Sequence, residues 1–297
     1  MQSPTIQILV VYCWMLAYIC LACTATKFVG FQFRCTSNCH FPLSSSEPKI
    51  CSQYHRKGME MRGGNNQHST DWREARARLA AGSQDQWDLM LERNQNRAMR
   101  SVKVWAHEIF HPEPGCLVIS QPYQNEKQGS ILGDQGVAVL FDYNPNEGAT
   151  GFFLNQPSVM TIKDVTEELP EFQNCPLYCG GEHGSGQLSI LHGVPDIPRS
   201  KMIVEGLYVG GDLQLARELV SSGQAMPNDF KFMLQKQQWT PSQLEWEMEL
   251  GIWQLASSNV EVILKSESNT EMPLWREVMS LMGGIHELKA RDVYDEL

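Results

Sequence analysis

The sequence holds few basic side chains outside its amino-terminal end. Five of the 24 lysines and arginines and one of the 34 acidic residues lie in residues 1–58, which leaves 19 and 33, a net charge of −14, for the remainder. An acidic surface repels nucleic-acid phosphates, and the one Lys/Arg-rich stretch, Arg73–Arg100, is typical of a solvated helix. We therefore expect no direct nucleic-acid binding.

Cysteine is scarce in the same part of the chain. Six of the nine cysteines lie in the first 51 residues, and only Cys116, Cys175 and Cys179 follow. This odd number argues against a disulfide framework and for a reducing or mixed compartment. The chain also lacks an Asn-x-Ser/Thr sequence, which disfavours the secretory lumen.

Signatures of known catalytic sites are missing as well. The sequence contains no Walker phosphate loop, no Gly-x-Gly-x-x-Gly, no Gly-x-Ser-x-Gly and no defensible Ser-His-Asp order. His107-Glu-Ile-Phe-His111 matches a zinc-protease string, but Pro112 disfavours helical backbone at His111, so we predict a loop there. We expect no catalytic residue, no metal and no cofactor, and favour a protein that is not an enzyme.

The amino-terminal region resembles a targeting sequence. Ile6–Cys23 is apolar and nearly uncharged, as in a signal peptide, although a membrane anchor is the alternative. Thr26–Lys57 is rich in serine and threonine, basic and almost free of acid, as in a transit peptide. A signal-like segment 1–25 before a transit-like segment 26–58 predicts plastid import and a mature form without stable membrane association. The secretory lumen is the other alternative, because Tyr294–Leu297 resembles a retrieval signal.

The rest of the chain divides into a linker with a helical extension, residues 59–111, and a main domain, residues 112–297. Capping residues and hydrophobic spacing predict helices from Asp71, over 86–104, 212–219 and 241–256, and from Pro273. Apolar runs predict strands at 116–120, 136–142, 149–154, 176–178, 187–192, 205–209 and 260–264. Hairpins mixed with helices indicate an α+β fold, with a mixed or antiparallel sheet packed against helices.

Several short motifs in a fixed order carry a resemblance to a family. They are Pro114–Ser120, Gly148–Gly151, Leu154–Pro157, Gly180-Gly181, Leu191-His192, Gly206–Gly210, Trp239–Glu245, Gly251–Trp253 and Leu274-Trp275. Over residues 112–284 the chain resembles the YqgE/AlgH family of bacterial proteins and its plastid relatives. Asp71–Arg76 and Trp105–Gly115 resemble the extension of plant chloroplast members. The sequence departs from the family at Glu182, where a proline commonly follows the two glycines.

The resemblance implies a sheet packed against helices and no defined reaction. We predict a non-catalytic binding or regulatory protein with an unknown protein or small-molecule partner. The candidate ligand-binding residues are Asn155, Gly180, Gly181, His192, Trp239 and Gln243. The alternatives are a redox or small-molecule-processing enzyme that uses Cys179 and His192, and an indirect transcriptional regulator.

Each candidate also has a structural interpretation. Asn155 is suited to a turn, Gly180-Gly181 to a tight connection between strands, and His192 to a buried position at a strand end. Trp239, Trp246 and Trp253 recur every seven residues, which favours helix packing over a ligand cage. Gln243 forms a capping box with Thr240. Cys175 and Cys179 are too far apart for a disulfide if the segment between them is extended, so we expect ordinary thiols.

Overall fold

Eleven strands dominate the part of the chain that the computed structural model describes, residues 71–98, 103–121, 135–265 and 272–295. The predicted targeting region 1–58 and linker 59–70 lie outside these residues. The strands are β1 (Ala106–Ile109), β2 (Leu117–Ser120), β3 (Val137–Asn144), β4 (Gly148–Phe153), β5 (Pro157–Thr161), β6 (Pro176–Cys179), β7 (His183–His192), β8 (Ser200–Val204), β9 (Leu207–Gly210), β10 (Phe230–Trp239) and β11 (Trp253–Ser258).

The strands form one sheet in the order β1-β11-β2-β3-β4-β10-β7-β9-β8, with β6 between β10 and β5. All pairs in it are antiparallel except β6 with β10. The helices are α2 (Trp72–Ala81), α3 (Gln84–Ala98), α4 (Leu213–Ser221), α5 (Gln243–Glu249), α6 (Val260–Ile263), α7 (Leu274–Met282) and α8 (Gly284–Asp295), with short 3₁₀ turns at Ile162–Asp164, Pro170–Phe172 and Pro227–Asp229. The predicted α+β class is confirmed.

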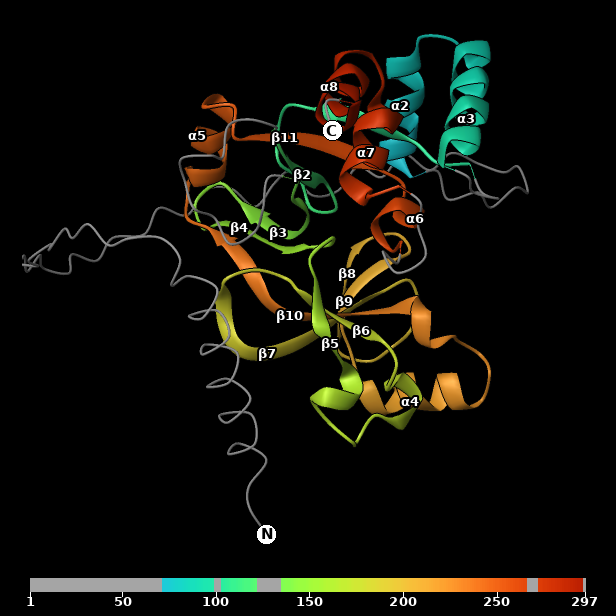
Figure 1. Cartoon of the computed structure of the whole chain (residues 1–297), viewed down its shortest axis with the longest axis vertical. Coiled ribbons are helices and arrows are strands. Elements are labelled where there is room, and N and C mark those ends of the chain that lie inside the picture. Colours follow the sequence, from blue (N-terminus) through green and yellow to red (C-terminus); the bar gives the residue numbers. More distant parts are fainter. Residues whose placement is uncertain (1–70, 99–102, 122–134, 266–271, 296–297) are drawn as a thin grey trace, which may run out of the picture. The chain divides into compact units, whose positions relative to one another are not determined.

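Both faces of the central strands are buried, which explains their continuous apolar sequences. Leu117 and Ile119 of β2 pack in the core that contains α7, while Val118 packs on the other face with Trp239 of β10. A third core lies beneath β6, β7 and β10 and includes Ala216 of α4. Figure 1 shows α7 and α8 beside β11, and α4 beside the β5–β6 end.

The long strand β10 joins the two ends of the sheet. Residues 237–239 pair with β4, whereas residues 230–234 pair with β7 and β6. Between these regions the register shifts, and Gln235 adopts a φ of 63°. The sequence interpretation left this strand out because the segment alternates irregularly between apolar and polar residues.

The predicted helix over 241–256 is wrong beyond its first half. Helix α5 ends at Glu249, Gly251 turns the chain with a φ of 73°, and Trp253 begins β11. Trp239, Trp246 and Trp253 therefore lie on a strand, a helix and another strand. Pairing of β11 with both β1 and β2 outweighs the local helical spacing.

Three more local predictions differ from the structure. The predicted strand 260–264 is helix α6, which begins after Asn259 and buries Val262 and Ile263. Helix α3 is assigned to residue 98, and residues 103–105 lead extended into β1, so the predicted helix 86–104 ends too late. The predicted loop at His107 is strand β1, because its pairing with β11 satisfies the backbone there.

Predictions that rest on side-chain caps are confirmed. Asp71 accepts the N–H of Arg73, and Asp212 accepts the N–H groups of Gln214 and Leu215 at the start of α4. Gln243 accepts the N–H and hydroxyl of Thr240, although α5 itself begins at Gln243.

Candidate functional site

A hollow of about 500 Å³ opens where β1 ends beside β11. Its lining comes from the end of β1, the residue after β2, helix α5, strand β11 and helix α8. The residues that matter below are Glu108, Phe110, Gln121, Trp253, Gln254 and Lys289. None of the six residues predicted from the sequence lines it.

A chain of hydrogen bonds forms the polar side of this hollow. Lys289 Nζ donates to Gln121 Oε1 over 2.8 Å, and Gln121 Nε2 donates to Gln254 Oε1. Gln254 Nε2 lies 2.9 Å from His286 Nδ1, and His286 Nε2 lies 3.4 Å from a carboxylate oxygen of Glu108. With Gln254 as the donor, His286 carries its proton on Nε2, facing Glu108.

The bond directions in this chain are uniform: each donor points away from the ammonium of Lys289 and toward the carboxylate of Glu108. The two amides are therefore held in fixed orientations, with a cationic and an anionic end exposed to the same hollow. A site with fixed dipoles of this kind is pre-organised for a polar ligand and needs little rearrangement on binding.

A second hollow, of about 380 Å³, adjoins β1 on the side of α2 and is bordered by His107, Glu108 and His286. Both imidazoles already have polar partners. Arg76 Nε donates to His107 Nε2, and burial followed by the Arg76 charge lowers the pKa of His107 to about 4. The His-Glu-x-x-His string begins on strand β1, and His111 lies beyond the end of that strand, so its histidines do not share a helix face. Among the described residues no group of three His, Cys, Asp or Glu side chains is arranged to hold a metal.

A family model described as AlgH-like matches residues 132–287, more than half of the chain. The chain belongs to the AlgH-like family. It is 27% identical to a UPF0301 protein of Bacteroides fragilis over 64% of this chain and 92% of that protein, and 30% identical to one of Chlorobium luteolum over 52% and 79%. The solution structure of the AlgH protein from Pseudomonas aeruginosa is similar, with a TM-score of 0.42 and 18% identity over 64% of this chain and 94% of that one.

The lining of the first hollow lies partly inside and partly outside the residues that the AlgH-like family model matches. Trp253 and Gln254 lie inside the matched residues, whereas Glu108, Gln121 and Lys289 lie outside them. These side chains come from segments far apart in the sequence, and Gln121, Gln254 and Lys289 stand in no motif. The only local signal was Gly251–Trp253, which the sequence interpretation placed on a helix.

The predicted glycine pair of the AlgH-like domain packs against the bend in β10. A Cβ on Gly180 would lie 2.5 Å from the Gln235 carbonyl oxygen, and one on Gly181 would lie 2.1 Å from the Gln237 nitrogen. The Gly180 N–H donates to the Leu234 carbonyl, and its own carbonyl accepts from Phe153. In these contacts the two glycines allow backbones to approach closely.

The other predicted residues lie apart from one another and have structural contacts. Asn155 accepts the Val137 N–H and donates to the Gln135 carbonyl, so it holds the start of β3. Trp239 is buried in the core beside Trp253, and Gln243 donates to Glu247. A ligand-binding role for these residues stays a prediction.

His192 is fully buried at the end of β7. Its ring stacks on Tyr208, and its Nδ1 and Nε2 each lie 3.0 Å from a carbonyl oxygen, of Val194 and Gly210 respectively. Burial lowers the pKa of His192, while the two carbonyl contacts act in the opposite direction. The imidazole is thus enclosed between the loop after β7 and the end of β9, and it lines neither of the two hollows.

The three thiols of the AlgH-like body are poor nucleophiles. Burial raises the pKa of Cys116 to about 12, that of Cys175 to about 11, and that of Cys179 above its usual value. Cys179 lies opposite Leu234 and His192 opposite Phe230 on β10, four residues apart, which is roughly 13 Å along a strand. The pair proposed for a redox enzyme is therefore separated.

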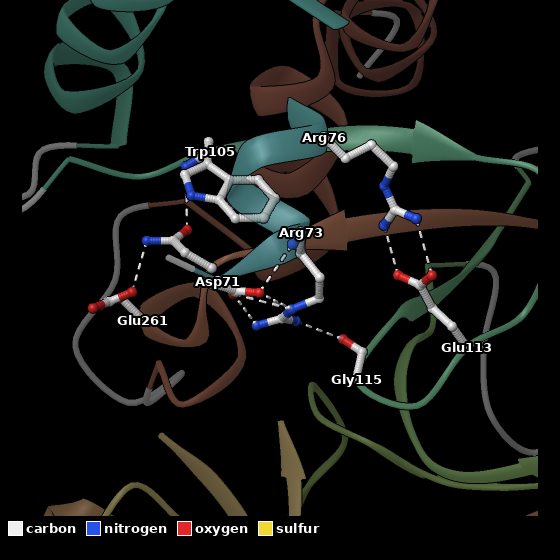
Figure 2. Close-up of polar contacts among 8 residues, drawn as sticks. Asp71, Arg73, Arg76, Trp105, Glu113, Gly115 and Glu261 are labelled. Atoms are coloured by element: carbon white, nitrogen blue, oxygen red, sulfur yellow. Dashed lines mark hydrogen bonds and ion pairs between the residues drawn. The ribbon is translucent and has the colours of Figure 1, made fainter. Parts of the chain in front are cut away.

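Arginines of α2 bind the segment that follows β1 (Figure 2). Arg73 is fully buried, pairs with Asp71 and donates to the carbonyl oxygen of Gly115. Arg76 makes two hydrogen bonds to the Glu113 carboxylate, at 3.0 and 2.6 Å. Farther along, Asn259 accepts the N–H of Trp105. Helix α2 therefore holds β1 and the segment after it, and with them one wall of the hollow.

Proposed function

We propose that this AlgH-like protein is a non-catalytic binding protein whose ligand occupies the hollow between β1, β11 and α8. The hydrogen-bonded chain from Lys289 to His286, whose Nε2 lies 3.4 Å from Glu108, carries this proposal. It fixes a cation, two amides and a carboxylate on one wall, while Phe110 and Trp253 supply apolar surface. Binding sites commonly combine apolar walls with a few fixed polar groups in this way.

Three observations argue against catalysis by Cys179 and His192, the residues of the alternative enzyme, and therefore favour a binding protein. The thiols are protonated at neutral pH, His192 is enclosed, and Cys179 lies far from His192. Indirect regulation of transcription is compatible with the proposal, because such a regulator also acts through a bound partner. The names of these relatives, UPF0301 proteins, indicate no reaction.

The proposal is tested with full-length protein labelled with 5-fluorotryptophan, whose eight tryptophans report separately by ¹⁹F NMR. The Trp253→Phe variant identifies the resonance of Trp253, because that resonance is missing from the spectrum of the variant. A panel of amino acids, short peptides, nucleotides and carboxylic acids is added in turn. We expect at least one class to shift Trp253 and leave Trp72, on α2, unchanged.

The matched variants are Lys289→Gln and, as control, Lys163→Gln on the 3₁₀ turn beyond β5. Loss of the Lys289 charge should change the affinity for the bound class by roughly three- to tenfold, with a decrease for an anionic ligand and an increase for a cationic one, and the control should not change it. A panel that leaves Trp253 unmoved, or a class whose affinity both variants change equally, contradicts a ligand in this hollow.

We further propose that the protein acts in a plastid after removal of residues 1–58. The acid-poor, hydroxyl-rich composition of residues 26–57 behind an apolar segment supports this location. A fluorescent fusion of the whole chain should accumulate in plastids, and a fusion without residues 1–58 should remain outside them. Accumulation of the whole chain in the endoplasmic reticulum would contradict the proposal.

No helix among the described residues is long and apolar enough to cross a membrane.

A further inference from the structure

The wall of the hollow formed by β11 is a strand edge. Strand β1 pairs with β11 only from Ile109 opposite Leu255 to Ala106 opposite Ser258. Strand β11 continues to Trp253, but Phe110 and His111 bend away. Among the described residues, no strand lies opposite Trp253 on the β1 side.

The backbone of Trp253 faces this edge. In an antiparallel ladder, alternate residues direct their N–H and C=O groups to opposite neighbours. The Ile252 carbonyl accepts the N–H of Gln121 on the β2 side. Trp253 lies opposite Ser120, whose own N–H donates away from β11, to the carbonyl of Gly136 just before β3. Trp253 therefore directs its N–H and C=O toward the hollow, where β1 would have continued.

Apolar side chains flank the edge. Phe110, at the mouth of the hollow, is 74% exposed, while Met248 and Trp253 are half-buried. Trp246 and Leu250, on the neighbouring helix α5, are exposed as well. An extended segment beside β11 would place alternate side chains against this surface, since side chains alternate along a strand.

The charge around the hollow is predominantly negative. Helix α5 carries Glu245, Glu247 and Glu249 and no lysine or arginine, and Glu108 and Asp292 line the opening. The one lysine of the lining, Lys289, directs its ammonium to Gln121. A second copy of this chain would bring two acidic α5 helices together, and an anionic membrane would be repelled, so both are disfavoured.

Given the proposed function, we infer that the ligand is an extended peptide segment of a protein partner, in which basic and apolar residues alternate. The segment continues β1 by pairing with the backbone of Trp253. Its apolar residues contact Phe110 and Met248, and its basic residues, on the opposite face of the segment, face Glu108 and, on α8, Asp292. Addition of a strand to a free sheet edge is a recurrent mode of peptide recognition.

The probe is a fluorescein-labelled hexapeptide of alternating lysine and valine, added to the full-length protein and followed by fluorescence anisotropy. Two comparison peptides carry glutamate in place of lysine, or N-methyl groups on alternate backbone nitrogens. We expect each comparison peptide to bind at least about tenfold more weakly, because one lacks the charge and the other the strand donors. Affinity for the lysine peptide should also fall with added salt.

Paired variants locate the contact. Asp292→Lys and Phe110→Ser should each lower affinity about tenfold, whereas Glu182→Lys and Met226→Ser, at exposed positions near β7 and β10, should change it less than about twofold. Hydrogen exchange at the Trp253 amide should slow when the peptide binds.

The outcomes separate this inference from the proposed function. Equal binding of the N-methylated or glutamate peptide, or equal effects of all four variants, overturns the inference. If the lysine peptide leaves the ¹⁹F resonance of Trp253 unmoved while another compound class shifts it, the hollow binds a different ligand and the proposed function stands. If neither shifts it, both are wrong.

Discussion

Replacement of Gly181 by alanine is expected to lower the free energy of unfolding by more than about 3 kcal/mol. The added Cβ would lie 2.1 Å from both the Gln237 nitrogen and the Lys236 carbonyl carbon. These are backbone atoms of the bent strand β10, which pairs with β4, β6 and β7, so they cannot move without disturbing several strands. The expected loss of stability arises from steric overlap of the added Cβ and not from backbone strain, because Gly181 does not adopt a positive φ.

Urea unfolding followed by circular dichroism measures this effect. Gly223→Ala is the control: Gly223 has a φ of 73°, but a Cβ there meets nothing within 4 Å. Its expected cost is only about 1 kcal/mol, from the left-handed backbone alone. If Gly181→Ala is no more destabilised than the control, the glycine pair is not kept for packing, and the predicted ligand-binding role of Gly180 and Gly181 becomes the better explanation.

Local chemistry made the caps and the central strands predictable. Asp71 and Asp212 each have a side chain that satisfies the first N–H groups of the helix that follows, and this requires no distant partner. Strand β2 is apolar at its first three positions, Leu117 to Ile119, because both of its faces are buried. In these cases the sequence holds all the information that determines the element.

Elements that depend on distant partners were missed. The segment Gln254–Ser258 has helical spacing with α5, yet it is a strand because β1 and β2 lie on either side of it. Val260–Ile263 is rich in β-branched residues, yet it is helical because that conformation buries Val262 and Ile263 against the core. Intrinsic preferences of about 1 kcal/mol or less per residue are easily outweighed by such packing.

The candidate site was not predictable for a related reason. Its polar chain joins Glu108, Gln121, Gln254, His286 and Lys289, which come from four separated parts of the chain. Apart from Glu108, which stands in the His-Glu-x-x-His string, each is an ordinary polar residue in its own sequence context. The family motifs instead led to glycines and to Asn155, where the structure shows close packing and turn geometry.

The second large effect is expected where the extension meets the AlgH-like domain. Arg73→Met keeps most of the buried side-chain volume but removes the guanidinium that binds Asp71 and the Gly115 carbonyl. Loss of one partner of a buried ion pair leaves polar groups unsatisfied, and we expect a cost of about 3 kcal/mol. Because α2 packs on β1, the same variant should weaken peptide binding at the hollow.

Arg78→Met is the matched control, on the same helix and in an i,i+4 pair with Glu74 whose side chains are 47% and 33% exposed. Such a pair contributes less than about 0.5 kcal/mol, so its loss should barely change stability. Urea midpoints give the global effect, and the rate of trypsin cleavage after Arg76 reports local opening of α2. Arg73→Met should be cut faster than the control. Equal cutting rates and equal midpoints would mean that Arg73 does not hold the extension, and β1 would then owe its position beside the hollow to β11 alone.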